Sequence, residues 1–274
     1  MNLQGNFKAI IEEILKKGPV VHAITNSVTA GDCAAVALAA GAHPVMAEAP
    51  EEVEEFTAGA DVLVLNLGLL SESRMESMEL AAEEARKAGI PVVLDPVGVM
   101  SSDMRLAFAL KLLQTGAITV VRGNFSECRA LLDQETGGRG VDSTETPDQA
   151  AALRIVKEAA KEYGCIFALT GATDYVSDGK RAVMLGGGNP LMAQIPGAGC
   201  MTSVMVGICL SVAEDAMEGT ALGIVIMGQA AELAAGLLET KDGPGMFRVR
   251  LIDGVYHVVN KWNLINRMDP DRVN

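Results

Sequence analysis

The sequence is poor in aromatic residues and in basic charge, and both shortages narrow the class of protein. Aromatic residues make up 4% of the 274 residues, although hydrophobic residues make up 49%. A core of Ala, Val, Leu, Ile and Met suits helices packed on a mostly parallel sheet. The net charge is −13, from 22 basic and 35 acidic residues. This balance argues against nucleic acid or an anionic membrane surface as a partner. A nucleotide could still bind through backbone amides, one or two cations and a divalent metal.

Paired cysteines and uninterrupted hydrophobic runs are also missing. The five cysteines show no CxxC spacing, so neither a disulfide framework nor a zinc site is indicated, and a reducing cytoplasm fits best. The first five residues contain no basic segment ahead of an apolar one, so we expect no signal peptide. Polar Gln229 and Glu232 interrupt the longest apolar run, residues 221–238, which predicts a buried helix in place of a membrane span.

Short β-branched runs alternate along the chain with helical patterns. This alternation predicts an α/β fold of three layers, with a mostly parallel central sheet and helices on both faces. No break in composition marks a second domain, so we expect one domain over residues 1–274. The expected strands are residues 20–24, 62–65, 92–94, 118–121 and 166–169. The expected helices are residues 30–40, 71–88, 103–114, 126–132 and 147–163.

The pattern changes in the last part of the chain. Residues 174–185 read as a hairpin with a two-residue turn at Asp178-Gly179, which would add antiparallel strands at one edge of the sheet. Two long helices are expected after Cys200, the second from near Asp215. Residues 134–147, rich in Gly, Asp and Thr, are expected to form a loop.

A glycine turn, Pro196-Gly197-Ala198-Gly199-Cys200, directly precedes a long apolar stretch. It reads as the N-terminus of a helix, where backbone N–H groups and the helix dipole suit an anion such as a phosphoryl group in transfer. Cys200 stands at the tip, and the pKa of a thiol is expected to fall at a helix N-terminus. The same pattern also fits close helix packing, with Cys200 as a small core residue.

Polar residues follow three successive expected strands. Asp95, Arg122 and Thr170 each come at a strand end, and Glu127 falls in the first turn of the next helix. Ligands gather at the carboxyl ends of parallel strands. Asp95 and Glu127 would hold a hydrated Mg²⁺, and Arg122 would neutralise phosphate oxygens. Individually, the same residues also fit a turn, a capping box begun by Asn124, and a strand exit.

The order of these motifs along the chain resembles their order in one family of kinases. The chain is similar to the hydroxyethylthiazole kinases, members of the ribokinase-like group, over about residues 15 to 260. Cys200 is the sharpest marker, because ribokinase-like enzymes mostly have aspartate there. The matching segments are Val21-His22-Ala23-Ile24-Thr25-Asn26, Gly41-Ala42-His43-Pro44-Val45-Met46-Ala47, Leu94-Asp95-Pro96-Val97-Gly98, Val121-Arg122-Gly123-Asn124-Phe125-Ser126-Glu127, Asp174-Tyr175-Val176-Ser177-Asp178-Gly179, Gly197-Ala198-Gly199-Cys200 and Gly243-Pro244-Gly245-Met246-Phe247.

The resemblance implies ATP-dependent phosphorylation of the primary alcohol of 4-methyl-5-(2-hydroxyethyl)thiazole, a thiamine salvage step in the cytoplasm. It also implies Mg²⁺ and a homotrimer with active sites between subunits. By position in the matching motifs, the substrate would contact Met46, Asn26 and Gly197, and Cys200 would act in catalysis. The nucleotide phosphates would meet Arg122, Thr170 and the amides of Ala198 and Gly199, and the metal would meet Asp95 and Glu127.

Three departures from the family pattern bear on the substrate. Pro196 and Ala198 stand where the family usually has threonines, Ala23 replaces a common asparagine, and Val99-Met100-Ser101 replaces Ala-Gly-Ala. Another ribokinase-like kinase, for a hydroxymethylpyrimidine, pyridoxal or a sugar, is one alternative, and a hydrate dehydratase on a similar fold is another. Cys200 counts against both. A non-catalytic binder is a third alternative, although binding alone would not need the full set of metal and anion residues.

Overall fold

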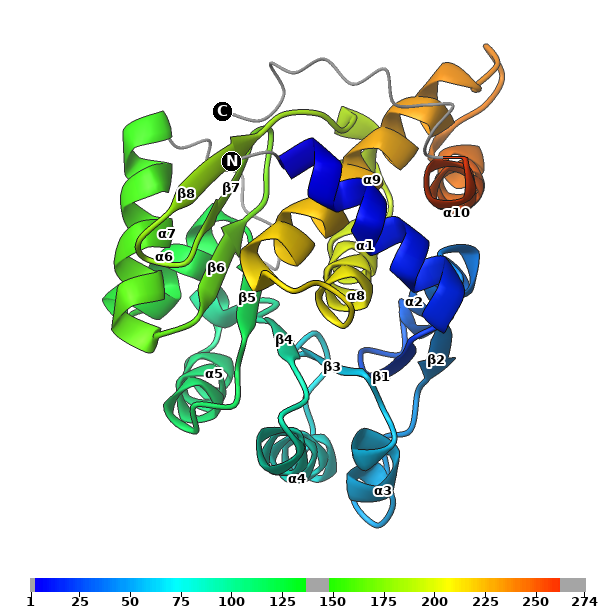
Figure 1. Ribbon diagram of the computed structural model, residues 1–274. Coiled ribbons are helices and arrows are strands. Elements are labelled where there is room, and N and C mark those ends of the chain that lie inside the picture. The colour runs from blue at the N-terminus through cyan, green and yellow to red at the C-terminus, as the bar shows by residue number, and fades with distance from the viewer. Residues whose placement is uncertain (1–2, 137–147, 262–274) are drawn as a thin grey trace.

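The computed structural model describes residues 3–136 and 148–261, which form a central sheet between two layers of helices (Figure 1). Eight strands follow the order β2-β1-β3-β4-β5-β6-β7-β8 within these residues. All pairs from β2 to β6 are parallel, and β7 and β8 are antiparallel additions at one edge. The predicted fold class and edge hairpin are therefore confirmed. The strands are β1 Val20–Ile24, β2 His43–Val45, β3 Val62–Asn66, β4 Val92–Asp95, β5 Val120–Gly123, β6 Ile166–Leu169, β7 Asp174–Ser177 and β8 Ala182–Leu185.

Both faces of the sheet are buried, because alternate residues of each strand enter different helical layers. In β3, Val62 and Val64 pack with one hydrophobic cluster, and Leu63 and Leu65 pack with the other. The first layer contains α1 Leu3–Lys17, α2 Ala30–Ala39, α8 Ala198–Leu210, α9 Ala216–Gly236 and α10 Pro244–Asn260. The second contains α3 Val53–Ala58, α4 Glu72–Ala88, α5 Asp103–Gln114, α6 Phe125–Asp133 and α7 Gln149–Tyr163.

Helix α9 confirms the prediction of a buried apolar helix. It begins after Asp215, whose carboxylate accepts from the Met217 amide (2.9 Å). By length and composition alone α9 could cross a membrane, but 72% of its most apolar window is buried inside the fold. Its apolar surface is therefore explained by packing against α8, α10 and the sheet.

Several local features differ from the sequence-based expectations. The connection between β7 and β8 has four residues, not two, because the Asp178 carboxylate accepts from the amides of Lys180 (2.9 Å) and Arg181 (2.6 Å) and closes a wider turn. The structure adds elements that were not expected from the sequence: α1, β2, α10 and the short 3₁₀ helices η1 Val99–Ser101 and η2 Pro190–Gln194. Most of the expected loop at residues 134–147 lies outside the described residues.

The parallel strands bring their carboxyl ends to one edge of the sheet. Asn66 at the end of β3 is the register partner of Asp95 at the end of β4. Arg122 lies at the same level in β5, one residue beyond the Leu94–Val121 pair. Helix α8 packs against β3 and β4. Residues far apart in the sequence thus meet around the first turn of α8.

Candidate active site

The glycine turn forms the N-terminus of α8 as predicted. Gly197 caps the helix with a φ of 79°, and a Cβ atom there would lie 2.4 Å from the Thr29 Cγ2 atom, so only glycine fits. The Met201 amide donates to the Gly197 carbonyl (2.8 Å), which leaves the amides of Ala198, Gly199 and Cys200 outside the helical hydrogen-bond ladder. These three N–H groups and the helix dipole define an anion-binding position.

Arg122 lies directly against this turn. A Cβ atom on Gly199 would come within 2.5 Å of the Arg122 Nη1 atom. Arg122 Nη2 donates to the Thr170 hydroxyl, and Nη1 lies 3.7 Å from the Asp95 carboxylate. The buried Arg122 Nε has no hydrogen-bond partner among the described residues. The structure therefore gathers Arg122, Thr170 and Gly199 at one point and leaves a donor there for a ligand.

Asp95 is buried beside Arg122, with 1% of its surface exposed. Its Oδ2 atom accepts from Asn66 Nδ2 (2.9 Å) and from the Ser203 hydroxyl (2.8 Å). Its Oδ1 atom is buried and has no partner in the described part of the chain. Burial raises the pKa of Asp95 despite the nearby guanidinium. One carboxylate oxygen is thus fixed by neighbours, and the other is left for a ligand.

Cys200 lies beside Asp95 in the third position of α8. Its Sγ atom accepts from Asn66 Nδ2 (3.2 Å) and Asn26 Nδ2 (3.5 Å). Burial, and then the charge of Asp95, raise the pKa of the Cys200 thiol. The sequence-based expectation of a lowered thiol pKa was therefore wrong, because these two effects outweigh the favourable ones from Thr29, Arg122 and Asn66. The other four cysteines are buried packing residues.

Glu127 closes the site from α6. Its Oε2 atom accepts from the Asn124 amide (2.8 Å) and its Oε1 atom from the Gly98 amide (3.0 Å). The Glu127 amide in turn donates to Asn124 Oδ1 (2.9 Å), so the capping box is real. Burial, and then the charge of Asp95, raise the pKa of Glu127 to about 7. Glu127 therefore has a structural role, and the pKa of its carboxyl group also depends on the charge of Asp95.

Asp95 and Glu127 provide too few ligands for a metal ion that is coordinated mainly by protein side chains. No group of three or more His, Cys, Asp or Glu residues that could hold a metal occurs among the described residues. A hydrated Mg²⁺ needs fewer, since it keeps several waters and takes one or two carboxylates. The buried, unpartnered Oδ1 atom of Asp95 meets that requirement. Both oxygens of Glu127 already accept from backbone amides, so Glu127 would act on the ion through water. The residues present therefore fit Mg²⁺ held mainly through water.

The loop after β2 places Met46 and Ala47 beside the first helical layer. Met46 is half-buried against that layer. His22 holds the loop: Nε2 donates to the Ala47 carbonyl (2.9 Å), and Nδ1 accepts from the Thr57 hydroxyl (2.9 Å). Burial lowers the pKa of His22, which keeps the imidazole neutral. His22 is therefore a structural residue that positions the loop of Met46.

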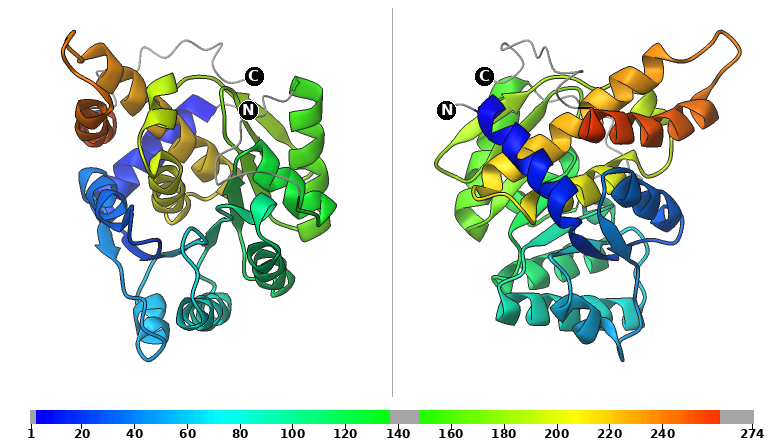
Figure 2. Two further views of the ribbon diagram at one scale, coloured as in Figure 1. Left: turned by 180° about the vertical axis from the view of Figure 1, so that it is seen from behind. Right: turned by 45° about the vertical axis from the view of Figure 1, so that its right-hand side comes forward.

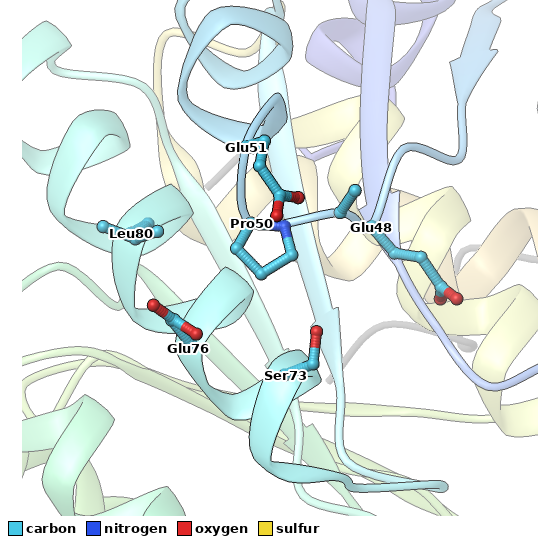
Figure 3. A pocket seen from close by; sticks show the side chains of 7 residues that line it. Glu48, Pro50, Glu51, Ser73, Glu76 and Leu80 are labelled. Atoms are coloured by element: carbon cyan, nitrogen blue, oxygen red, sulfur yellow. The ribbon is translucent and has the colours of Figure 1, made fainter.

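A cavity of about 660 Å³ opens next to this loop, between the segment before α3 and helix α4 (Figure 3). Its lining includes three acidic side chains, Glu48, Glu51 and Glu76. None of the predicted site residues lines it, and its acidic character does not suit nucleotide phosphates. The cavity is therefore separate from the site at α8.

Two residues of the site, Asn66 and Ser203, were not expected from the sequence. Asn66 joins Asp95 to Cys200, and Ser203 donates to Asp95. The signal for Asn66 was present: like Asp95 and Arg122, it is a polar residue directly after an apolar strand. The expected strand stopped one residue short of it. Ser203 carried no such signal, because its role depends on the approach of α8 to β4.

The fold is that of the ribokinase-like class. The fold is shared with a pyridoxal kinase from Bacillus subtilis, solved as an ADP complex, with a TM-score of 0.61 and 17% identity, covering 78% of this chain and 91% of that one.

The chain belongs to the hydroxyethylthiazole kinase family, whose model matches residues 11–261. A hydroxyethylthiazole kinase from Alkaliphilus metalliredigens is 38% identical over 252 residues, 92% of each chain. The structure of the hydroxyethylthiazole kinase protein from Pyrococcus horikoshii OT3 has a TM-score of 0.83 and 35% identity, again over 92% of each chain. The predicted family, fold group and kinase class are thereby confirmed.

Proposed function

We propose that this chain transfers the γ-phosphoryl group of ATP to the primary hydroxyl of 4-methyl-5-(2-hydroxyethyl)thiazole, a step of thiamine biosynthesis or salvage. The observation that supports this most directly is the meeting of Cys200, Arg122 and three free amides at the N-terminus of α8. That arrangement offers a hydroxyl-binding sulfur and a phosphoryl-binding turn within one site.

In this proposal the first turn of α8 receives the transferred group. Phosphoryl transfer runs through a loose transition state, so positioning and charge neutralisation provide most of the acceleration. The amides of Ala198, Gly199 and Cys200 would receive the developing charge, and one such donor is worth roughly 3 kcal/mol. Arg122 and Thr170 would bind the nucleotide phosphates. Cys200 would orient the alcohol and accept its proton late in the transfer.

The substrate and metal sites flank this turn. Asn26 donates to the Cys200 sulfur, and Gly197 opens the turn, so both would lie against the thiazole alcohol. Met46 would contact the thiazole ring from the loop after β2. Asp95 and Glu127 would hold Mg²⁺, which when bound neutralises phosphate oxygens.

We further infer that residues 1–274 act as one kinase domain in a cytoplasmic homotrimer with active sites between subunits. Exposed apolar side chains support association: Leu38 of α2 is 61% exposed, and Val249 and Tyr256 of α10 are 55% and 50% exposed. Helix α10 and the end of α9 project from the rest of the chain (Figure 2). A projecting arm with exposed apolar residues is suited to bind a neighbouring subunit.

The test is product formation by the purified protein with ATP, Mg²⁺ and the hydroxyethylthiazole. Mass spectrometry should find the phosphate ester and ADP, both lost when Mg²⁺ is withheld or Arg122 is replaced by Met. No ester from folded protein that binds ATP would reject the thiazole as substrate, and other small alcohols would then be assayed. Release of inorganic phosphate without a phosphorylated alcohol, if it depends on an added hydrate that loses water, would indicate a hydrate dehydratase.

A further inference from the structure

Asn66 uses the whole hydrogen-bonding capacity of its side chain inside the site. It is 1% exposed at the end of β3. Its two N–H groups go to Asp95 Oδ2 (2.9 Å) and Cys200 Sγ (3.2 Å). Its carbonyl oxygen accepts from Asn26 Nδ2 (3.0 Å) and from the Gly68 amide (3.0 Å). A side-chain amide has two donor hydrogens and one acceptor oxygen with two lone pairs, so nothing is left over.

These four partners allow only one orientation of the Asn66 amide. Rotation by half a turn would place its oxygen against the Asp95 carboxylate and its NH₂ group against two other donors. Each of those contacts would be repulsive in a buried site. The direction of the two N–H groups is therefore set by the fold.

This orientation restricts the sulfur of Cys200. Asn66 and Asn26 both direct N–H groups at the Sγ atom, so neither direction can take the thiol proton. The proton of the thiol, or the remaining lone pair of a thiolate, must lie on another side of the sulfur. Donors of this kind also stabilise negative charge on the sulfur when it forms.

The same amide fixes the carboxylate of Asp95. Asn66 and Ser203 both donate to Oδ2, so the carboxylate is locked with its Oδ1 atom buried and without a partner. One side chain thus determines which face of the sulfur and which oxygen of the acid are available to ligands.

We propose that Asn66 is a positioning residue, which holds the Cys200 sulfur and the Asp95 carboxylate in one shared orientation for phosphoryl transfer. This inference rests on the kinase activity proposed above. It adds a role for a residue whose side-chain hydrogen bonds all go to other groups of the protein in the described structure.

The main test is Asn66→Asp, which keeps the size and the accepting oxygen but replaces both N–H donors. We expect kcat to fall by about 10- to 100-fold, since hydrogen bonds to charged groups are lost. The KM for ATP should change little, because the hydrogen bonds of the Asn66 side chain in the described structure go to Asp95, Cys200, Asn26 and Gly68, not to Arg122 or Thr170. Thermal melting would establish that the variant is folded.

Ser203→Ala is the matched control, because it removes a donor from Asp95 but not from Cys200. Each change is combined with Cys200→Ser in a double-mutant cycle. Asn66→Asp should cost much less kcat in the Cys200→Ser background than in the wild type. Ser203→Ala should cost nearly the same in both.

A second readout does not need the enzyme activity. Cys200 is half-buried and the other four cysteines are buried, so iodoacetamide should label Cys200 selectively in the folded protein. Asn66→Ser, the milder variant if Asn66→Asp does not fold, should label more slowly at equal pH, because it loses a donor that stabilises the thiolate. Ser203→Ala should label at a rate close to that of the wild type, with the site of modification identified by peptide mass spectrometry.

The outcomes separate this inference from the proposed activity. If the wild type makes no ester, the proposed function fails, and the labelling rates alone decide the role of Asn66. If the wild type is active, an unchanged kcat in folded Asn66→Asp overturns the inference. The inference is also overturned if the fold-losses in kcat of Asn66→Asp and Cys200→Ser multiply in the double variant. It is overturned as well if iodoacetamide labels Cys200 in Asn66→Ser as fast as in the wild type, or faster.

Discussion

Cys200 experiences two opposing influences on the charge of its sulfur. The helix N-terminus and two amide donors favour a thiolate, whereas burial and Asp95 oppose it and raise the pKa of the thiol. A sulfur in this balance suits a reaction that takes the proton late, because the thiolate is not needed before the phosphoryl group begins to move.

This balance predicts different outcomes for two substitutions of Cys200. We expect Cys200→Ser to lower kcat by about 10- to 100-fold and to raise KM less, because a weaker acceptor replaces the sulfur. Cys200→Asp should keep substantial activity, since a carboxylate is a sufficient base at this position. Steady-state kinetics on folded variants measures both. An unchanged kcat in Cys200→Ser would remove Cys200 from the chemistry, and an inactive Cys200→Asp would mean that the size of the thiol is what matters.

Asp174 predicts an effect on stability. Its Oδ1 atom accepts from the Gly171 amide (2.9 Å), and burial raises its pKa from 3.8 to about 6. Between these pH values the folded chain keeps a proton that the unfolded chain releases, so Asp174 lowers stability increasingly as pH rises from about 4 to 6 and by a constant amount above that. Asp174→Asn should therefore stabilise the protein by up to about 3 kcal/mol at pH 7. Urea unfolding should show this gain shrinking towards pH 4, and equal stability at pH 7 would contradict the assignment.

The sequence identified most residues of the site but not their interactions. Asp95, Arg122 and Thr170 could be placed together because the carboxyl ends of parallel strands share one edge, whereas Cys200 was placed with them only by the family resemblance. The pKa direction of Cys200 could not be predicted, because it depends on burial and on a charge from a residue more than 100 positions away. The carboxylate contacts of Glu127 were clearer from the start, since a capping box is local.

Among the secondary-structure elements, α8 packs so closely against Arg122 that adding one methyl group at Gly199 should disturb the site. Gly199→Ala would place a methyl group 2.5 Å from Arg122 Nη1 and displace the guanidinium. We expect kcat/KM for ATP to fall by at least about tenfold, whereas stability should hold or rise, since alanine favours a helix by up to about 1 kcal/mol. Gly236→Ala in α9, with open space around it, is the control and should keep full activity. Retained activity in Gly199→Ala would show that Arg122 can shift without loss.

Elements with strong periodicity or clear caps were predictable, and those defined by distant partners were not. The strands expected for β3, β4 and β6, and the helices between them, agree with the structure to within two residues, whereas β5 begins and ends two residues later than expected. Strand β2, only three residues long, exists because it pairs with β1 and has little pattern of its own. The prediction of a two-residue turn between β7 and β8 was wrong, because the Asp178 carboxylate accepts hydrogen bonds from two later amides and so favours a longer connection.

At the scale of the whole molecule, the exposed apolar residues of α2 and α10 predict the mass of the assembly in solution. We expect light scattering to give about 86 kDa, the mass of three 28.6 kDa chains. Val249→Lys, at a position 55% exposed on α10, should disperse the trimer because it would bury a charge in the interface. Met104→Lys, at a comparable 51% exposure on α5, should not. A monomeric wild type would contradict the proposed assembly.

The shared environment of Asp95 and Glu127 has a consequence for calorimetry. With a pKa of about 7, Glu127 carries a proton in a large fraction of molecules at neutral pH. A divalent cation held near Glu127 with the nucleotide, as proposed above, would favour the ionised acid, and the proton would pass to the buffer. The heat of binding should therefore differ between phosphate and Tris, and the slope against the ionisation enthalpy of the buffer counts the protons released.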